Sequence, residues 1–182
     1  FYISTHYKSE KIREYFKDGS EFGAHIQYIH EDIPLGTAGS LGLLPRDIPD
    51  LPVIVMNGDL LTKVDFNNLL EFHNASGADA TMCVREYDIQ VPFGVVKMKE
   101  GRIQKITEKP VHNFFVNAGI YVLNHKLIKK VDGESYLDMP DLLKNELDNK
   151  GINAFPIHEY WLDIGRIEEY KKGNQDAALF NK

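Results

Sequence analysis

Residues 53–59, VIVMNGD, join a continuous apolar run to a polar turn. The run Val53–Met56 is typical of a parallel β-strand that is covered on both faces. Ligands of open α/β sheets bind beyond the carboxyl ends of the strands, and Gly58 allows a sharp turn there. We therefore predict that Asp59 faces a crevice, where its carboxylate suits a hard cation such as Mg²⁺. The alternative is a simple turn in which Asp59 caps the next segment.

Strand-like and helix-like segments alternate on both sides of this stretch. One helix is predicted over Lys8–Phe16, a short one over Thr37–Leu44, and a third is capped by Asp65 and closed by Gly77. Strands are predicted at Phe1–Ser4 (the end of a buried strand), His25–His30, Val53–Met56 and Ala80–Arg85. This order implies βαβ units. The predicted fold class is therefore α/β, with a Rossmann-like mixed, mainly parallel sheet flanked by helices.

The second half of the chain has a different pattern. Short β-rich segments separated by turns predict antiparallel strands that extend the same sheet over residues 92–123. Pro140, preceded by Asp138, is typical of the start of an amphipathic helix. Strands are predicted at Ile152–Ile157 and Tyr160–Ile164, and a closing helix from Arg166 onward.

Length and composition indicate one compact domain, residues 1–182, because no repeat or linker divides the 182 residues. The formal net charge of −6 argues against nucleic acid as a partner, and no apolar stretch approaches the length of a membrane span. Cys83, the one cysteine, lies in an apolar run and is predicted to be a buried core residue rather than a reactive thiol. A chain without an internal disulfide is compatible with the cytoplasm, which is the location we predict.

Asp163 repeats the arrangement of Asp59. The apolar strand Tyr160-Trp161-Leu162 precedes it, and Gly165 allows the chain to turn into a helix. Two carboxylates at strand ends of one sheet predict a shared Mg²⁺ site, because Mg²⁺ usually takes one or two protein carboxylates together with substrate phosphates. The alternative for Asp163 is to cap the following helix.

Residues 34–39, PLGTAG, join a strand to a short helix. The small residues around Gly36 and Thr37 leave room for a flat ring against the backbone, with N–H groups free to bind it. The stretch is neither a Walker loop nor G-x-G-x-x-G, so it is a weak phosphate signal. Glu31, just before it, is a candidate acceptor for a base edge, and a solvated acid at a strand end is the alternative.

Glu108-Lys109-Pro110 ends a predicted strand. Lys109 could supply a point charge to a phosphate and Glu108 an acceptor to sugar hydroxyls, unless the two form an ordinary exposed ion pair. Gly94, in Phe93-Gly94, and Gly119, in Asn117-Ala118-Gly119, interrupt β-forming sequence. Such glycines mark a bulge or a close approach by a ligand or a backbone.

These segments together resemble the family of sugar-1-phosphate nucleotidyltransferases, and the resemblance covers nearly the whole chain. The motifs that carry it, in the order of that family, are Glu31 with Pro34–Gly39, Asn57–Asp59, Phe93-Gly94, Glu108–Pro110, Asn117–Gly119 and Trp161–Gly165. The ordered set is much more specific than any one of its motifs.

The resemblance implies a nucleotidyl transfer in which an oxygen of a sugar 1-phosphate attacks the α-phosphorus of an NTP and pyrophosphate leaves. Glu31, Gly36 and Thr37 would then bind the nucleotide. Asp59 and Asp163 would hold Mg²⁺, the implied cofactor. Sugar and sugar phosphate would be bound by Gly94, Glu108, Lys109, Asn117 and Gly119. Such a reaction needs in-line positioning and neutralisation of phosphate charge.

One family feature has no copy in the sequence: a Gly-rich loop with an Arg, followed by Pro-Lys-Pro, which grips the triphosphate. We expect the first strand and this loop to precede Phe1, so that residues 1–182 alone turn over little. Apolar surface beside the lost strand would then favour self-association into a homo-oligomer. Arg166, where many relatives have Thr, either contacts phosphate or points to solvent.

Two other functions compete with the enzyme. A non-catalytic sugar-nucleotide-binding or regulatory subunit would have little need for Asp59, Lys109 and Asp163 together, and a Rossmann dehydrogenase lacks its G-x-G-x-x-G here. Glu31 favours guanine as the base, because a carboxylate only accepts hydrogen bonds and guanine offers two neighbouring donors. Thymine and uracil offer one N3–H between two carbonyl oxygens, so GTP is the predicted substrate.

Overall fold

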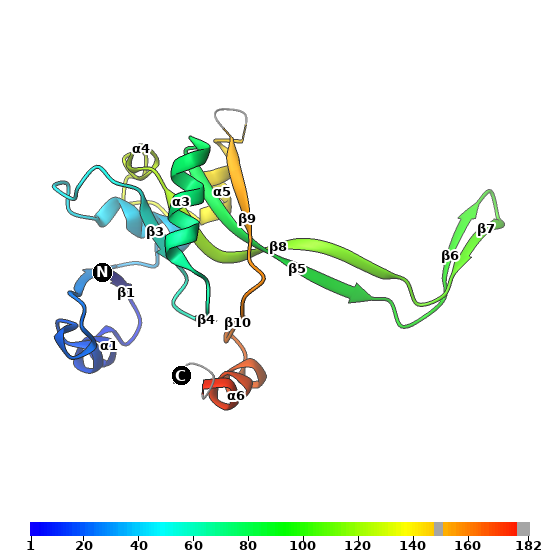
Figure 1. The fold of residues 1–182 in the computed structure, drawn as a ribbon, viewed down its shortest axis with the longest axis horizontal. Helices are drawn as coiled ribbons and strands as arrows, with labels where there is room; N and C mark the ends of the chain where they lie inside the picture. Colours follow the sequence, from blue (N-terminus) through cyan, green and yellow to red (C-terminus); the bar gives the residue numbers. More distant parts are fainter. Residues whose placement is uncertain (148–150, 178–182) are drawn as a thin grey trace.

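The computed structural model describes residues 1–147 and 151–177 of the chain, and Figure 1 labels most of its helices and strands. The strands are β1 (Tyr2–Thr5), β2 (Gln27–His30), β3 (Val53–Met56), β4 (Leu60–Thr62), β5 (Ala80–Gln90), β6 (Val95–Lys99), β7 (Arg102–Thr107), β8 (Val111–Leu123), β9 (Ile152–Pro156) and β10 (Trp161–Asp163). The α-helices are α1 (Ser9–Phe16), α2 (Gly36–Gly39), α3 (Phe66–Ser76), α4 (His125–Ile128), α5 (Met139–Lys144) and α6 (Ile167–Asp176), with 3₁₀ turns η1 (Ser20–Phe22) and η2 (Ser40–Leu43). The α/β class is confirmed.

The largest sheet has the strand order β3-β8-β5-β9. β9 runs parallel to β5, whereas β8 runs antiparallel to both β3 and β5. β3, β5 and β9 therefore share one direction, and the sheet is mixed as predicted, although its pairings are mainly antiparallel, since only β5 and β9 pair in parallel. The antiparallel strand is not an addition at the edge, however. β8 is inserted between β3 and β5, so its C-terminal half lies at the centre of the sheet.

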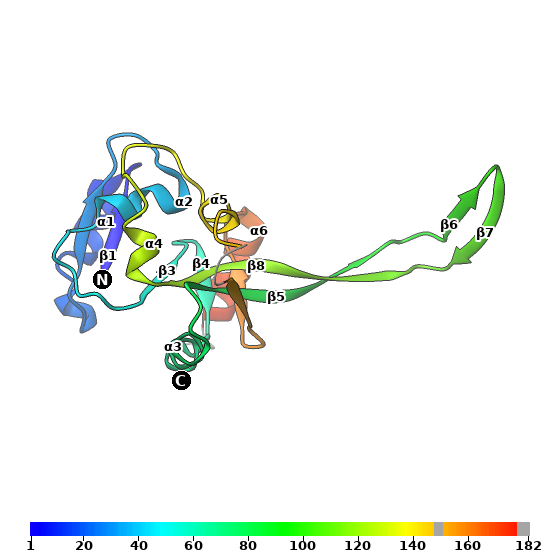
Figure 2. The same cartoon turned by 90° about the horizontal axis from the view of Figure 1, so that it is seen from above.

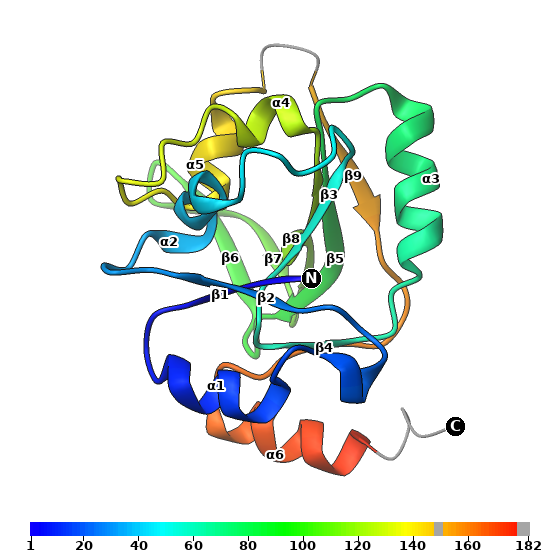
Figure 3. The same cartoon turned by 90° about the vertical axis from the view of Figure 1, so that its left-hand side faces the viewer.

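The core lies on both faces of this sheet, and β8 shows why. Ala118, Ile120 and Val122 belong to one buried cluster, together with Leu69 of α3. Their neighbours Tyr121 and Leu123 belong to a second cluster, whose other members include Ala38, Leu127, Met139, Leu142 and Leu143. Successive strand residues point to opposite faces, so one apolar strand serves two cores. Figure 3 shows α3 on one side of the sheet and α2, α4 and α5 on the other.

β5 and β8 continue beyond the sheet as a two-stranded arm, with pairing from Val84↔Asn117 to Gln90↔Val111. At its end β6 and β7 pair only with each other. Figures 1 and 2 show this hairpin extended away from the rest of the protein. The prediction that residues 92–123 all extend the main sheet is thus wrong for the hairpin. The sequence pattern specifies local antiparallel pairing, whereas the bend of a ribbon depends on tertiary contacts.

Two strands predicted to be buried are less covered than expected. β1 pairs in parallel with β2 in a separate two-stranded sheet, and Tyr2 is 43% exposed. β3 is an edge strand of the larger sheet among the described residues, and Val53–Val55 are only half-buried although the run is apolar throughout. The continuous apolar pattern identifies a strand but not the number of its neighbours.

The local helix signals are confirmed. The carboxylate of Asp65 accepts hydrogen bonds from the N–H groups of Asn67 and Asn68 at 2.9 and 3.2 Å. It thereby satisfies N–H groups in the first turn of α3 that have no partner within the helix. Gly77 ends that helix with φ of 66°, the left-handed conformation that favours glycine. α5 begins with Pro140 in its first turn, after Asp138. No helix in the described part of the chain is long and apolar enough to cross a membrane.

His73 links α3 to the sheet through a buried polar contact. Its Nδ1 lies 2.9 Å from the hydroxyl of Thr81 on β5, and its Nε2 lies 3.1 Å from Oδ1 of Asn124. Replacing His73 by Leu removes the hydrogen-bond partner of both Thr81 and Asn124 and leaves the Thr81 hydroxyl buried without that partner. We expect the free energy of unfolding to fall by about 1–3 kcal/mol, measured by urea denaturation. The matching change at the exposed His158 should leave the midpoint unchanged, and equal effects at both positions would contradict this reading.

Candidate active site

Asp59 and Asp163 come together on a two-stranded ribbon. β4 pairs antiparallel with β10, Asp163 lies opposite Leu60, and Ile164 N–H donates to the carbonyl of Asp59 at 2.8 Å. Gly165 follows, and a Cβ built on it would lie 3.0 Å from Oδ1 of Asp163 and 3.7 Å from Oδ2 of Asp59. Both carboxylates thus approach the same point beside Gly165. A side chain there would occupy the space between them.

Asp163 does not cap the following helix, which was its alternative, and the segment that follows Asp59 is a strand rather than a helix. Arg166 is the N-cap residue of α6, and Asp59 precedes the strand β4. Asp163 accepts the N–H of Gly165 at 2.9 Å within its own turn. Both aspartates are exposed to solvent. The carboxylate oxygens are therefore open to a ligand on the side away from the turn.

Gly119 brings the Asn117–Gly119 segment against the Asn57–Asp59 turn. Asn57 N–H donates to the carbonyl of Gly119 at 2.9 Å, and Trp161 Nε1 donates to the carbonyl of Ala118 at 2.8 Å. Asn117 accepts the N–H of Gly119 at 2.9 Å and donates to the hydroxyl of Tyr121 at 2.5 Å. The structure therefore joins four predicted site residues in one cluster: Asp59, Asp163, Asn117 and Gly119.

Gly119 has φ of +70°, and a Cβ on it would lie 2.7 Å from Nδ2 of Asn57. Gly119→Ala is expected to lower the free energy of unfolding by about 2–4 kcal/mol, from backbone strain together with the clash. Gly101→Ala is the control, since Gly101 has φ of +76° and nothing within 4 Å of a built Cβ. It should show the strain alone. Equal losses in thermal or urea unfolding would mean that the close approach at Asn57 costs nothing.

Glu31 is half-buried and accepts two hydrogen bonds from the protein. Its Oε2 accepts the N–H of Leu35 at 2.9 Å, and its Oε1 accepts the hydroxyl of Ser4. The half-buried carboxylate therefore ties the end of β2 and the strand β1 to the turn that carries Gly36. The alternative, an acid at a strand end that meets only solvent, is wrong. Each oxygen keeps one further lone-pair direction for a ligand, because a carboxylate oxygen can accept two hydrogen bonds.

The turn at Gly36 and Thr37 makes different contacts from those predicted. The N–H groups of Ala38 and Gly39 donate to the carbonyl of Leu137 at 2.9 and 3.1 Å, and Thr37 N–H donates to Oδ1 of Asp138 at 3.1 Å. These three donors are used by the protein, so the expectation of free N–H groups is wrong for residues 37–39. The sequence could not show it, because the partners lie about a hundred residues further along the chain.

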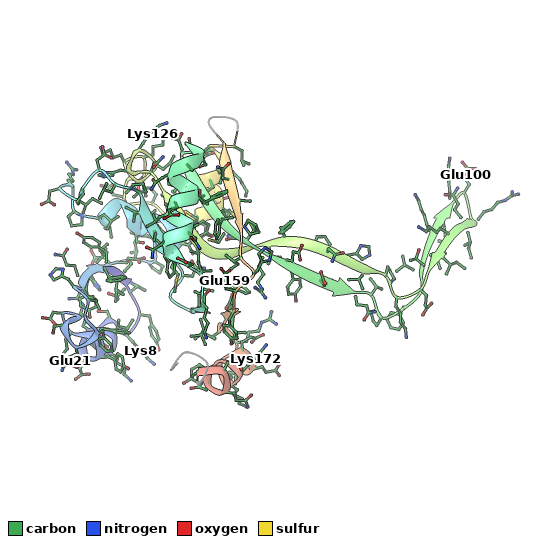
Figure 4. The ribbon with its side chains drawn as sticks, in the orientation of Figure 1. Lys8, Glu21, Glu100, Lys126, Glu159 and Lys172 are labelled. Carbon is green, nitrogen blue, oxygen red and sulfur yellow. The ribbon has the colours of Figure 1, made fainter. Side chains whose placement is uncertain are left out.

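Gly94, Glu108 and Lys109 lie where the β5–β8 arm meets the β6–β7 hairpin. A Cβ on Gly94 would lie 2.9 Å from Oε2 of Glu108, so these two residues are neighbours. Lys109 is exposed, with φ of 42°, and the described residues form no ion pair between it and Glu108. Figure 4 shows Glu100 at the hairpin tip, far from Glu159 and Lys172 near β10 and α6. The structure therefore separates Gly94, Glu108 and Lys109 from the two aspartates of the β4–β10 ribbon.

Two cavities lie beside β1, and none of the predicted site residues lines either. The larger, of about 310 Å³, is bounded by Gln27–His30 of β2 with Tyr2, Leu43 and Pro45. Within the described residues, no group of three or more His, Cys, Asp or Glu side chains is close enough to hold a metal ion. The Asp59–Asp163 pair nevertheless fits Mg²⁺, since both donors are hard oxygens and two carboxylates suffice when substrate phosphates complete the shell.

Two residues that hold predicted site residues in place were missed by the sequence reasoning. Ser4 donates to Glu31, and Asp138 holds Thr37. Asp138 was identified only as the residue before a helix. The pKa of Tyr121 is raised, mainly by burial and also by the charge of Asp138, although the hydrogen bond from Asn117 lowers it. Asp138 therefore holds the turn at Thr37, and its charge also acts on Tyr121, the hydroxyl partner of Asn117.

The chain belongs to the Nucleotidyl transferase family, whose sequence pattern it matches over residues 1–178. It is 30% identical over 180 residues to a mannose-1-phosphate guanyltransferase of Schizosaccharomyces pombe, covering 94% of this chain and 49% of that protein. A mannose-1-phosphate guanylyltransferase of Arabidopsis thaliana is 31% identical, with 94% and 50% covered. The chain thus spans about half the length of the curated relatives that it matches.

Solved structures agree on the fold. A Bacillus anthracis protein assigned as a glucose-1-phosphate thymidylyltransferase superposes with a TM-score of 0.72 at 22% identity, covering 97% of this chain and 75% of that one. HddC from Yersinia pseudotuberculosis, complexed with GMP-PN, superposes with a TM-score of 0.69 at 22% identity, covering 97% and 77%. The resemblance inferred from the ordered motifs is confirmed at the level of family and fold.

Proposed function

We propose that the protein transfers a nucleotidyl group from GTP to a sugar 1-phosphate, giving an NDP-sugar and pyrophosphate. The observation that carries the proposal is the approach of Asp59 and Asp163 to one point beside Gly165, in a chain of the Nucleotidyl transferase family. The relatives named for mannose-1-phosphate guanylyl transfer support both guanine and mannose 1-phosphate as first choices.

Asp59 and Asp163 are the residues that would hold Mg²⁺. The ion would supply positive charge to the phosphate oxygens as the α-phosphorus is attacked. The turn between Gly165 and α6 keeps the Asp163 carboxylate oriented through its hydrogen bond from Gly165 N–H. Gly119 and Asn117 border the same cluster and are proposed to meet the sugar, while Glu31, Gly36 and Thr37 bind the nucleotide.

Gly94, Glu108 and Lys109 stay in the proposal as sugar-phosphate residues, on the condition that the arm brings them to the two aspartates. Spin labels at Glu100→Cys and Lys172→Cys test this, because Figure 4 places Glu100 at the tip of the hairpin and Lys172 on α6, far from it. Cys83 will not interfere, since it is fully buried and burial raises the pKa of its thiol to about 12. Any further cysteine of the full-length gene product would be replaced by serine.

We expect the distance between the two labels to shorten when Mg²⁺, GTP and mannose 1-phosphate are added, as read by double electron–electron resonance. The control pair is Lys126→Cys with Lys172→Cys, which both lie off the arm and should keep their distance. An unchanged Glu100–Lys172 distance in a catalytically active sample would remove Lys109 and its neighbours from the site.

The direct test of the function uses the full-length gene product that contains residues 1–182. It should release pyrophosphate and form GDP-mannose from GTP and mannose 1-phosphate when Mg²⁺ is present, and dTTP or UTP should serve less well. Residues 1–182 alone are proposed to turn over little, for want of a Gly-rich triphosphate loop within them. Nucleotide binding without turnover by the full-length product would favour the non-catalytic subunit. The cytoplasmic location and self-association remain part of the same proposal.

A further inference from the structure

Asp138 and Thr37 cap one another's helices. Asp138 is the N-cap residue of α5, yet its side chain caps no N–H of that helix. Oδ1 instead accepts the N–H of Thr37 at 3.1 Å and the Thr37 hydroxyl at 3.2 Å, in the first turn of α2. In return, the Thr37 hydroxyl accepts the N–H of Met139, the first residue of α5, at 2.8 Å. An N-cap side chain ordinarily serves its own helix, so this exchange ties two helix starts together.

The backbone around this exchange is packed too closely to shift independently. The carbonyl of Leu137 accepts from Ala38 and Gly39, and Leu137 N–H donates to the carbonyl of Leu35 at 2.9 Å. Gly36 has φ of +77°, and a Cβ on it would lie 2.7 Å from the carbonyl oxygen of Leu137 and 2.9 Å from Oδ1 of Asp138. Leu137 and Asp138 therefore fix where the turn at Gly36 lies.

The same contacts decide which backbone donor of the turn is left for a ligand. Leu35 N–H donates to Glu31, and the N–H groups at positions 37–39 donate to Leu137 and Asp138. Among the backbone N–H groups of residues 35–39 in the described structure, only that of Gly36 donates to no protein group. Its direction is set by the positive φ of Gly36, which glycine adopts without strain, and the close contact with Leu137 and Asp138 leaves no room for a side chain there.

We propose that Asp138 is a positioning residue for the nucleotide: by holding Thr37, it presents the Gly36 N–H to the base edge. The inference rests on the proposed function, in which this turn binds the nucleotide. Tyr136 completes the arrangement, since its hydroxyl donates to Oδ2 of Asp138 at 3.0 Å and holds the carboxylate in place. Hydrogen bonds from Thr37 and Tyr136 also lower the pKa of Asp138, so the carboxylate stays charged at neutral pH.

The test compares Asp138→Asn and Asp138→Ala with Asp132→Asn in the full-length gene product. Asp132 is a matched control: its carboxylate also accepts two backbone N–H groups and a hydroxyl, but all belong to Glu134 and Ser135 in its own turn. For Asp138→Ala we expect the KM for GTP to rise about tenfold, because hydrogen bonds to a charged group are lost. The turnover number and the KM for sugar 1-phosphate should change less than about twofold, since neither step uses the turn. The KM for GTP of Asp138→Asn should lie between that of Asp138→Ala and that of the unaltered protein.

Hydrogen exchange of the free protein gives an independent readout. The N–H groups of Thr37, Ala38 and Gly39 should exchange faster in Asp138→Ala and unchanged in Asp132→Asn. If GTP binds and Asp138→Ala leaves its KM unchanged, the positioning role is refuted while the function stands. A parallel loss in turnover number, both KM values and thermal stability would show a merely structural role and refute it too. If the unaltered full-length gene product binds no nucleotide, the proposed function fails and this inference fails with it.

Discussion

Asp163→Asn in the full-length gene product is expected to lower the turnover number by about 10²–10³-fold, the usual loss when one preorganised electrostatic group is removed. The amide keeps the shape of the side chain and can still accept the N–H of Gly165 through its oxygen. It no longer carries the charge that a divalent cation prefers. Asp59→Asn should have a similar effect, because its Oδ2 approaches the same point beside Gly165.

The measurement is pyrophosphate release over a range of Mg²⁺ concentrations. If the two carboxylates share the ion, both variants should also need more Mg²⁺ for half-maximal rate. Asp65→Asn is the control, since Asp65 is an exposed acid that caps α3 and Asn caps a helix equally well. Normal turnover by both Asp59→Asn and Asp163→Asn would eliminate the ribbon of β4 and β10 as the metal site.

Features encoded by neighbouring residues could be predicted from the sequence. The cap at Asp65, the end of α3 at Gly77 and the strand Val53–Met56 were all read correctly, because each depends on local conformational preference. The pairing of Asp59 with Asp163 also follows a general rule, that ligand sites lie at strand ends. The structure adds that these ends meet on the separate ribbon of β4 and β10.

Features that depend on distant partners could not be predicted. Thr37 and Asp138 are 101 positions apart, and no local pattern indicates that their side chains exchange caps. The course of the β5–β8 arm is a second case, since alternation fixes which residues pair but not how far a ribbon projects. Glu31 is a third, because its partner Ser4 lies on another strand. In each case the local motif could be recognised in the sequence, whereas the distant residues that it contacts could not.

Glu31→Gln is expected to reduce the preference for GTP over UTP by about 10–100-fold, the value of one or two mismatched polar contacts in a partly buried site. The carboxylate presents acceptors only, which suits the neighbouring N1–H and N2 amino donors of guanine. The carboxamide presents one acceptor and one donor, which suits the N3–H and carbonyl of uracil. Leu35 N–H requires an acceptor, so the amide oxygen should face Leu35 and the amide nitrogen should face Ser4, whose hydroxyl can also accept. The turn would then keep its shape while its hydrogen-bonding edge changes.

The measurement is kcat/KM for GTP, UTP and dTTP with one sugar 1-phosphate, because only the ratio between nucleotides reports on base reading. Ser4→Ala is the control: it removes the hydroxyl that Oε1 of Glu31 accepts but leaves the carboxylate and its bond to Leu35 in place. Ser4→Ala should lower kcat/KM for all three nucleotides by the same factor. A GTP preference that survives Glu31→Gln would assign base reading to the backbone N–H of Gly36 instead. A wild-type preference for UTP or dTTP would refute the choice of guanine altogether, since an acceptor-only group beside either carbonyl of those bases is repelled.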